Sequence, residues 1–354
     1  MAHLLLSGYF GSGNIGDDAI LLGFVQGLGD TQHELTVLSG APEETYRLYG
    51  LRSVPRKEMS RVKEAIDRCD ALVFPGGSIF QDVTSFASVA YYSKLVSMAK
   101  SKKKKVILLG QGVGPLKGFL GRRSAASAFN MADVIAVRDA QSVVTLRDIG
   151  VKVQPRVTAD CAFMLPKPRE VDNQQGFNVG NMKSVGISVR PHGKSKDTIR
   201  LFGELTRLLF KNNCMPVLIE MDKAADGPLI LEIAKAQGGK IPDLRKIQTP
   251  MQLQQRLSRM DSIIAMRLHA GILAATVGIV PLMVSYDPKV TAFAKLLDMG
   301  AASEVEGLTA QRLYDQFIEH QRARERNEKL LGPKIEELRK LAMVNIELLE
   351  QTLR

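Results

Sequence analysis

The chain has little of the chemistry that nucleic-acid-binding proteins use for stacking. Its 354 residues include no tryptophan, and aromatic residues make up only 6% of the total. Proteins that bind single strands stack the bases on aromatic side chains, and the sequence contains no recognised nucleic-acid-binding motif. We therefore expect no nucleic-acid partner.

Cysteine is also scarce. Cys69, Cys161 and Cys214 lie far apart in the sequence and show no metal-ligand spacing. This pattern argues against a disulfide framework and against a zinc-type cluster, and it favours reduced thiols in or near the core. We expect a cytoplasmic protein without a metal site.

Long hydrophobic runs are absent. No run approaches the roughly 20 apolar residues that a transmembrane helix needs. The first residues, Met1 to Gly8, contain no basic region, and their apolar run is too short for a signal peptide. We expect this run to be the first strand of a globular protein.

Acidic residues are outnumbered, with 48 Lys and Arg against 37 Asp and Glu and a net charge of +11. Such a balance favours acidic partners, among them phosphorylated metabolites and anionic membranes. We interpret the basic run Lys100 to Lys105 as a solvated helix end. Peripheral contact with anionic lipid on the inner membrane face is the weaker alternative.

The first half of the chain alternates short apolar runs with helical patterns, which is typical of a doubly wound parallel sheet. The hydrophobic pattern predicts strands at residues 4–7, 35–38, 71–74, 105–109 and 134–137. It predicts helices at residues 19–28, 61–68, 88–100, 122–131 and 140–149.

The rhythm breaks at Pro166-Lys167-Pro168 and restarts after a segment rich in Asn, Gln and Gly. We therefore expect two α/β lobes, at residues 1–168 and 184–332, with a linker at residues 169–183. Pro333 is expected to start the last helix, residues 333–354. In the second half we expect strands at residues 185–189, 216–220, 263–266 and 282–285, and helices at 196–211, 230–236, 251–260, 270–277 and 291–297.

The turn after the first strand, Gly11-Ser12-Gly13-Asn14-Ile15-Gly16, fits the glycine pattern of dinucleotide sites. Asp17 and Asp18 follow in the first helical turn, where carboxylates would repel a pyrophosphate. We therefore predict that Asn14, Asp17 and Asp18 bind the hydroxyl groups of a sugar. The alternative is that the aspartates cap the helix.

Two further glycine-containing segments follow strands, at residues 74–82 and 109–115. We interpret both as strand-end loops, because glycine lets a ligand approach the backbone. Gln81 and Asp82 in the first of them add polar groups for hydroxyls. Each segment alone could be a simple turn, but loops at successive strand ends are better support for a site.

Cationic residues also come at strand ends: Arg138, Arg190, Arg267, His269 and Lys289. Asp139, next to the first of them, is a candidate helix cap. Together such cations suit a small ligand that carries both carboxylate and phosphate. The alternative is that Arg267 pairs with a surface carboxylate and His269 is an ordinary half-buried residue.

The order of these motifs resembles that of the polysaccharide pyruvyl transferase family, and within it the bacterial enzymes that pyruvylate cell-wall polymers and so anchor surface-layer proteins. The resemblance extends from the first strand to about residue 297. It rests on Gly8-Tyr9-Phe10-Gly11, Asn14-Ile15-Gly16-Asp17-Asp18-Ala19, Pro75-Gly76-Gly77, Phe80-Gln81-Asp82, Gly110-Gln111-Gly112-Val113-Gly114-Pro115, Arg138-Asp139, Asp160, Arg267-Leu268-His269-Ala270 and Asp287-Pro288-Lys289.

The resemblance implies a fold similar to GT-B glycosyltransferases. Such a fold has two Rossmann-like lobes with parallel sheets, a cleft between them, and a last helix that returns to the first lobe. It also implies phosphoenolpyruvate as co-substrate, without a cofactor. The acceptor would be a sugar on the first lobe, of the type found in a lipid-diphosphate-linked disaccharide that contains N-acetylmannosamine. The product would be a 4,6-linked pyruvate ketal, with release of phosphate.

Carried onto this chain, the resemblance makes Arg138, His269 and Lys289 donor-binding residues, with Arg267 adjacent and Arg190 in the same cationic set. Histidine has a reference pKa near neutrality, so His269 is the candidate acid for C3 of the donor. Its rival role is to bind phosphate only. Asp17, before Asp82, is the candidate base at the sugar. Two other functions stay open: a nucleotide-sugar glycosyltransferase of the same fold, and a non-enzymatic module that binds anionic glycans.

Overall fold

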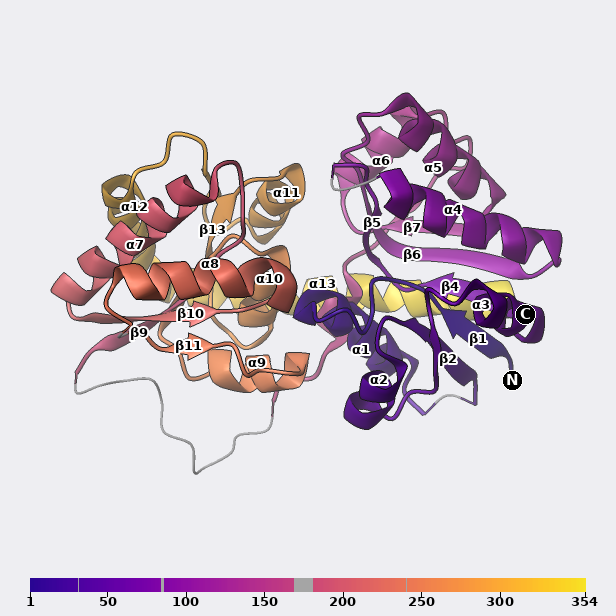
Figure 1. Cartoon of the computed structure of the whole chain (residues 1–354), viewed down its shortest axis with the longest axis horizontal. Coiled ribbons are helices and arrows are strands. Elements are labelled where there is room, and N and C mark those ends of the chain that lie inside the picture. The colour runs from indigo at the N-terminus through magenta and orange to yellow at the C-terminus, as the bar shows by residue number, and fades with distance from the viewer. Residues whose placement is uncertain (31, 84–85, 169–180, 240) are drawn as a thin grey trace. The chain divides into compact units, whose positions relative to one another are not determined.

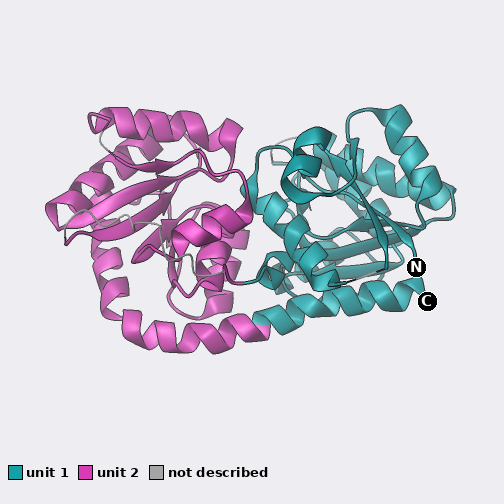
Figure 2. Cartoon of the chain, turned by 90° about the horizontal axis from the view of Figure 1, so that it is seen from below, with its two compact units in different colours: residues 1–166, 338–354 teal, residues 167–337 magenta. Residues whose placement is uncertain are grey.

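The computed structural model describes residues 1–30, 32–83, 86–168, 181–239 and 241–354. The chain divides into two compact units, shown in Figure 2: unit 1 comprises Met1–Pro166 and Leu338–Arg354, and unit 2 comprises Lys167–Glu337. Most of the linker that we expected at residues 169–183 lies outside the described residues. No helix in the described part of the chain is long and apolar enough to cross a membrane.

Unit 1 is built on an 8-stranded parallel sheet in the order β3-β2-β1-β4-β6-β7-β8, with β5 paired to β6. Its central strands are fully buried aliphatic runs, as expected where helices cover both faces of a parallel sheet. The strands are β1 (His3–Leu6), β2 (Glu34–Ser39), β3 (Ser53–Pro55), β4 (Ala71–Phe74), β5 (Gly77–Phe80), β6 (Lys105–Val113), β7 (Val134–Val137) and β8 (Arg156–Val157). The helices are α1 (Ile15–Leu28), α2 (Pro42–Tyr49), α3 (Met59–Arg68), α4 (Phe86–Ser101), α5 (Phe119–Met131), α6 (Ala140–Asp148) and the 3-10 helix η1 (Cys161–Met164).

Unit 2 repeats this architecture on a 6-stranded parallel sheet in the order β11-β10-β9-β12-β13-β14 (Figure 1). Its strands are β9 (Lys183–Ser188), β10 (Cys214–Ile219), β11 (Asp243–Leu244), β12 (Ser262–Ala265), β13 (Pro281–Ser285) and β14 (Ser303–Glu304). Its helices are α7 (Ser195–Lys211), α8 (Lys223–Ala236), α9 (Pro250–Leu257), α10 (Leu268–Thr276), α11 (Pro288–Leu297), α12 (Ala310–Arg322) and the first part of α13 (Arg324–Leu353). The predicted fold class, two Rossmann-like α/β lobes with parallel sheets, is confirmed.

The two glycine-containing segments that we interpreted as loops are largely strands. Residues 77–80 form β5, and β6 continues to Val113. The glycines interrupt the register rather than the strand: Gly76, Gly77 and Gly110 have positive φ, and the β6–β7 register shifts between Leu108 and Gln111. A bulge of this kind re-aims a strand without ending it.

The prediction that Pro333 starts the last helix is wrong, because Pro333 lies inside α13. Pro228 likewise lies inside α8, which begins at Lys223 and not near residue 230 as we predicted. A proline inside a helix leaves the carbonyl four residues earlier without its partner. Here those carbonyls belong to the exposed Lys329 and Ala224, where water can replace the missing N–H.

The last part of α13 belongs to unit 1 and is fixed there by Asn345, which is completely buried. Its Oδ1 accepts hydrogen bonds from Gly110 N at 3.1 Å and from Thr158 Oγ1 at 2.9 Å. Its Nδ2 donates to the carbonyl of Ala159 at 3.0 Å. One buried amide therefore satisfies three polar groups next to the bulge in β6.

Candidate functional site

In each unit the strand order reverses beside the first strand. In unit 1 this point lies between β1 and β4, and in unit 2 between β9 and β12. Ligands of open α/β sheets bind outside the carboxyl ends of the strands at such a point. Both β1 and β9 lead here into a buried serine, Ser7 or Ser188, whose hydroxyl has no hydrogen-bond partner among the described residues.

The turn after β1 is shaped by packing against the end of β2. Gly11 has φ of 61°, and a Cβ there would lie 2.1 Å from Ser39 Oγ. Asn14 caps α1, because its Oδ1 accepts a hydrogen bond from Gly16 N at 2.9 Å. Half-buried Asp17 lies beside the start of β5, where a Cβ built on Gly77 would be 3.5 Å from Asp17 Oδ1.

Asp18 is buried and already engaged within unit 1. It accepts hydrogen bonds from Gly11 N at 3.1 Å and from the Tyr49 hydroxyl at 3.0 Å. Burial is the main cause that raises the pKa of Asp18 to about 6, and the two hydrogen bonds oppose it. Burial, with the nearby Asp18 carboxylate, also raises the pKa of Tyr49.

Asp82 fixes the beginning of α5. Its two oxygens accept hydrogen bonds from Lys117 N at 2.8 Å and Gly118 N at 2.7 Å. Both N–H groups precede α5, so the carboxylate holds the turn that leads into the helix. The neighbouring Gln81 side chain accepts a hydrogen bond from Val83 N.

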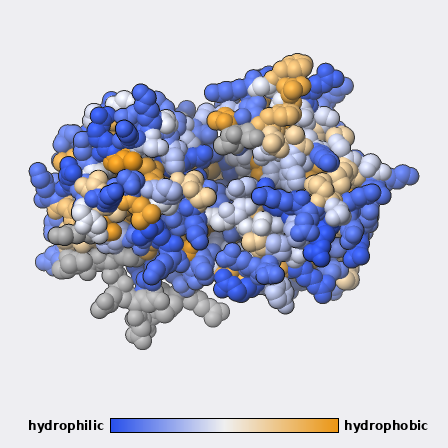
Figure 3. All heavy atoms as spheres, in the orientation of Figure 1, coloured by the Kyte–Doolittle hydropathy of each residue, from blue (hydrophilic) through white to orange (hydrophobic). Residues whose placement is uncertain are grey.

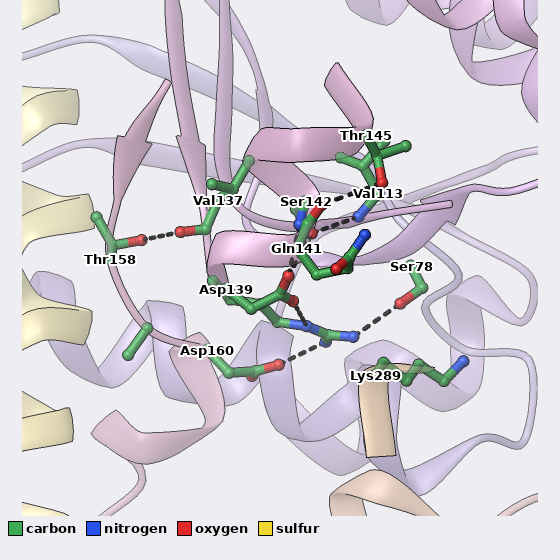
Figure 4. A network of polar contacts seen from close by, with 12 residues as sticks. Ser78, Val113, Val137, Asp139, Gln141, Ser142, Thr145, Thr158, Asp160 and Lys289 are labelled. Atoms are coloured by element: carbon green, nitrogen blue, oxygen red, sulfur yellow. Dashed lines mark hydrogen bonds and ion pairs between the residues drawn. The ribbon is translucent and has the colours of Figure 1, made fainter. Parts of the chain in front are cut away.

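Arg138 follows β7 and is buried in a polar network, shown in Figure 4. Its Nη1 donates to Asp160 Oδ2 at 2.7 Å, and its Nη2 donates to Ser78 Oγ at 2.7 Å. The guanidinium lies against Gly112, where a Cβ would be 2.6 Å from Nη2. This contact explains why glycine stands in β6 at that position. Asp139 caps α6 as predicted, accepting from Ser142 N at 2.7 Å.

Arg267 follows β12 and is the N-cap residue of α10. Its guanidinium donates through Nε and Nη2 to Asp226, which is completely buried on α8. Desolvation lowers the pKa of Arg267, but the Asp226 carboxylate outweighs it, so the pKa lies above its ordinary value. Arg267 therefore pairs with a carboxylate, as in the alternative that we left open, but the carboxylate is buried and not on the surface as that alternative had it.

Arg190, after β9, lies against the ring of Tyr286, which follows β13. The guanidinium carbon is 4.7 Å from the ring centroid, and Nη1 donates to the Tyr286 hydroxyl at 2.8 Å. The Lys289 ammonium is 6.0 Å from the same centroid. Tyr286 thus brings two of the predicted donor-binding cations together at the carboxyl edge of the unit 2 sheet.

Two of the predicted residues lie in the first turn of a helix, where a cation is opposed by the helix dipole. His269 is the second residue of α10 and is half-buried. Lys289 is the second residue of α11, and its Nζ is 3.6 Å from Asp287 Oδ2. His269 and Lys289 thus lie next to the N–H groups of two helix N-termini, and Asp287 balances part of the charge of Lys289.

The predicted residues thus form two sets. Asn14, Asp17, Asp18, Gln81, Asp82 and Arg138 lie in unit 1, and Arg190, Arg267, His269 and Lys289 lie in unit 2. Their roles as ligands of donor or acceptor stay predictions. No group of His, Cys, Asp and Glu that could hold a metal ion occurs among the residues that the structure describes.

The sequence model of the polysaccharide pyruvyl transferase family matches residues 14–288, which is more than half of the chain. The chain belongs to the polysaccharide pyruvyl transferase family. A search of curated proteins found no match for this family member.

Solved structures similar to this polysaccharide pyruvyl transferase family member show its fold. A putative UDP-N-acetylglucosamine 2-epimerase from Listeria monocytogenes has a TM-score of 0.62 at 12% identity, covering 93% of this chain and 90% of that chain. The MnaA–UDP co-structure of S. aureus has a TM-score of 0.63 at 14% identity, covering 94% and 90%. The glycosyltransferase of kitacinnamycin has a TM-score of 0.58 at 13% identity, covering 100% and 99%. The fold of this family member is therefore GT-B-like.

Several residues that organise the site were not found by sequence reasoning. Tyr49 and Asp226 fall in this class, and so does Ser78. A signal existed for Asp226, because Asp222 and Asp226 stand four residues apart on a helix, where like charges repel unless a cation balances them. For Tyr49 and Ser78 the sequence offers no comparable signal.

Proposed function

We propose that this protein transfers the pyruvyl group of phosphoenolpyruvate to a sugar of a cell-wall polysaccharide precursor. The product is a 4,6-linked pyruvate ketal, and phosphate is released. Membership of the polysaccharide pyruvyl transferase family supports a transferase of this class. The observation that carries the choice of donor is the cationic edge of unit 2.

That edge suits the donor in charge and in shape. Phosphoenolpyruvate carries a carboxylate and a phosphate, and the edge offers the Arg190 guanidinium, the Lys289 ammonium and two helix N-termini. Guanidinium binds carboxylate and phosphate through paired N–H groups, and an ammonium binds phosphate as a point charge. Arg267, already neutralised by Asp226, orients the start of α10 under this proposal.

The chemistry needs one acid and one base. His269 donates a proton to C3 of phosphoenolpyruvate, which gives C2 cation character, and one sugar oxygen bonds to C2 as its proton passes to Asp17. The second sugar oxygen then bonds to C2 while the C2–O bond to phosphate breaks. The second hydroxyl proton leaves with phosphate or with the base, so the methyl group, the ketal and phosphate account for all atoms.

The acceptor that we propose is a lipid-diphosphate-linked disaccharide containing N-acetylmannosamine, used at the cytoplasmic face of the membrane. Its pyruvylated product would belong to a secondary cell-wall polymer that anchors surface-layer proteins. Carboxylates and amides at the unit 1 edge, above all Asp17 and Asn14, suit sugar hydroxyls. Pyruvylation adds a negative charge to a neutral sugar, which would suit recognition by basic surface proteins.

The deciding experiment measures phosphate release from phosphoenolpyruvate with a panel of sugar acceptors, together with mass spectrometry of the ketal. We expect release only with an acceptor that presents the correct pair of hydroxyls. A nucleotide-sugar glycosyltransferase would instead be stabilised by a nucleoside diphosphate in a thermal-shift assay. A non-catalytic glycan-binding module would bind sugar and consume no phosphoenolpyruvate. Either result would remove the proposal.

A further inference from the structure

The positive charge of the chain is concentrated in one segment. Residues 83–132 contain no Asp or Glu and nine Lys or Arg, against a net charge of +11 for the whole chain. The segment comprises α4, β6 and α5. Part of its charge is balanced at the far end of α4, where Lys100 pairs with Asp133 at 2.9 Å and Lys102 pairs with Asp67 at 3.0 Å.

The same segment exposes large apolar side chains where α4 and α5 begin. Phe119 and Leu120, the first two residues of α5, are 73% and 62% exposed. Val83 and Phe86, at the start of α4, are 58% and 45% exposed. Figure 3 shows hydrophobic side chains gathered at the upper tip of unit 1, where α5 begins in Figure 1. We name these four residues the apolar tip.

The two helix starts that form the apolar tip are held together. α4 packs against α5. The Asp82 carboxylate, just before α4, accepts hydrogen bonds from the backbone N–H groups of Lys117 and Gly118, just before α5. Phe119 and Leu120 therefore follow a turn that the Asp82 carboxylate holds in place.

Basic residues flank the apolar tip. Lys117 precedes Phe119, and Arg122 and Arg123 follow Leu120 within one helical turn. Arg122 Nη2 donates to the carbonyl of Asp148 at 2.8 Å, which fixes its position. Within the described residues, no ion pair is recorded for Lys117 or Arg123. An adjacent aromatic and aliphatic pair between uncompensated cations is the composition of segments that insert into the interface of anionic membranes.

We propose that the apolar tip, with Lys117, Arg122 and Arg123, binds the surface of an anionic phospholipid membrane. The charge of the segment selects this partner, because the headgroups supply the acidic groups that the segment lacks. The proposal assigns contact to this tip and not to the basic run Lys100 to Lys105, whose first residues are balanced by acids.

The location of the apolar tip also bears on how the acceptor reaches the site. This inference rests on the proposed function. β5 starts at Gly77 beside Asp17 and is four residues long, which corresponds to about 13 Å. Gln81 and Asp82 follow it directly and lead to the tip. A sugar carried by a membrane lipid could therefore reach Asp17 while the tip contacts the membrane.

The test is flotation of the full-length protein with vesicles of phosphatidylcholine containing about 30% phosphatidylglycerol. We expect the wild type to float, and F119S/L120S to bind at least about tenfold more weakly because the apolar insertion is lost. K117Q/R123Q should lose about fivefold per charge. Raising the salt concentration should weaken wild-type binding, because salt screens exposed charges.

Matched control variants distinguish binding through the apolar tip from non-specific binding to the vesicles. L231S/L330S replaces two other exposed leucines, which are 49% and 48% exposed, and should float as the wild type does. K103Q/K104Q tests the basic run in the same way. Circular dichroism verifies that each variant is folded. Equal flotation of F119S/L120S and wild type, loss of binding in K103Q/K104Q instead, or a wild type that dimerises through the tip and does not float would each overturn the proposal.

A second readout uses activity. F119S/L120S should keep wild-type turnover with a water-soluble acceptor and lose turnover with the lipid-linked acceptor in vesicles. If the wild type pyruvylates neither acceptor, the proposed function fails, and flotation still decides whether the tip binds membranes. If F119S/L120S changes turnover with the water-soluble acceptor and with the lipid-linked acceptor equally, the tip has no role in presenting the lipid-linked acceptor, and this part of the inference is wrong.

Discussion

Each unit places an arginine directly after a strand and pairs it with a buried aspartate, but the two pairs differ in how the guanidinium is used. In unit 1, Arg138 divides its donors between Asp160 and Ser78, and its Nε lies 3.8 Å from Asp139. In unit 2, Arg267 directs both Nε and Nη2 at Asp226. The carboxylate of Asp226 also accepts hydrogen bonds from Met221 N and Asp222 N.

The comparison teaches that an arginine at a strand end is not by itself a ligand site. Both arginines are buried and compensated, so their first effect is to shape the edge of a sheet. The carboxyl edges of the two sheets differ in the residues that surround the arginine–aspartate pair. Unit 1 presents carboxylates and amides, and unit 2 presents Arg190 on an aromatic ring and His269 and Lys289 at helix N-termini.

The largest expected effect tests whether the edge of the unit 2 sheet supplies the catalytic acid. If unit 2 supplies the acid, His269→Gln should reduce turnover by about 10²- to 10⁴-fold, with only a modest loss of phosphoenolpyruvate affinity. Glutamine can hydrogen-bond phosphate but cannot give up a proton. Calorimetry gives the affinity, and incubation in heavy water shows whether the new methyl group is labelled. Turnover near the wild-type rate would leave His269 as a phosphate ligand.

The next effect compares how much the Arg267–Asp226 and Arg138–Asp160 pairs stabilise their units. Asp226→Asn should destabilise unit 2 by about 3–5 kcal/mol, because Arg267 would lose the carboxylate that accepts from both Nε and Nη2. Only Asp222, whose Oδ2 is 3.8 Å from Nη2, would remain near the buried guanidinium. Asp160→Asn should cost less, about 1–3 kcal/mol, because Arg138 keeps Ser78 and Asp139. Hydrogen exchange, which reports on each unit separately, measures both. Equal losses would mean that the two pairs are energetically equivalent.

A smaller effect tests whether Lys289, whose Nζ is 3.6 Å from Asp287 Oδ2, binds the donor. Lys289→Ala should weaken phosphoenolpyruvate binding by about 1.5–3 kcal/mol, which is roughly 10- to 150-fold, while the melting temperature stays the same. Lys295→Ala, in the last turn of the same helix, is the matched control and should change neither. Donor affinity that is unchanged in Lys289→Ala would remove this residue from the site.

The smallest effect concerns a buried carboxylate of unit 1 whose recorded partners are a phenol and a backbone amide rather than an arginine. The pKa of Asp18 is raised from 3.8 to about 6 by burial, so the folded state binds the proton more tightly than the unfolded state. The stability that this proton provides is complete below about pH 4 and is lost as the pH rises through about 6. Asp18→Asn should abolish this pH dependence and stabilise the protein by about 1–3 kcal/mol at pH 7.5. Parallel urea titrations from pH 4 to 8 measure it; identical slopes would contradict the assignment.

Most of the sheet strands could be predicted, because buried aliphatic runs such as residues 71–74 are continuous in the sequence. Glycine caused the errors at β5 and at the end of β6. The glycines were interpreted as parts of strand-end loops, whereas β6 continues through Gly110 and a new strand, β5, begins at Gly77 just after β4 ends. α2 and β3 were missed, since α2 buries only Thr45 and β3 is three half-buried residues, and neither leaves a clear apolar pattern.

The site could be predicted as a set of residue types but not as a set of contacts. Arg138 and Asp160 are 22 residues apart, and Arg267 and Asp226 are 41 residues apart. The spacing of Asp222 and Asp226 indicates that a cation is needed, but nothing local in the sequence indicates which arginine meets which aspartate. Asp82 shows the same limit, because the sequence does not distinguish a carboxylate that holds a turn from one that binds a sugar. The Asp139 cap was predictable because its partner, Ser142, is three residues away.

The position of Asn345 has a consequence for biosynthesis. During translation, β6 and β8 leave the ribosome long before Asn345, and all of unit 2 is made in between. Until then Gly110 N, Thr158 Oγ1 and the Ala159 carbonyl lack the partner that they have in the finished protein. Unit 1 therefore cannot complete its interior on the nascent chain. A message cut short after unit 2 would yield a product in which Gly110 N and the Ala159 carbonyl lose their Asn345 partner, while Thr158 Oγ1 keeps the Val137 carbonyl. Buried groups without partners mark a chain for the chaperone and protease systems that remove incomplete chains.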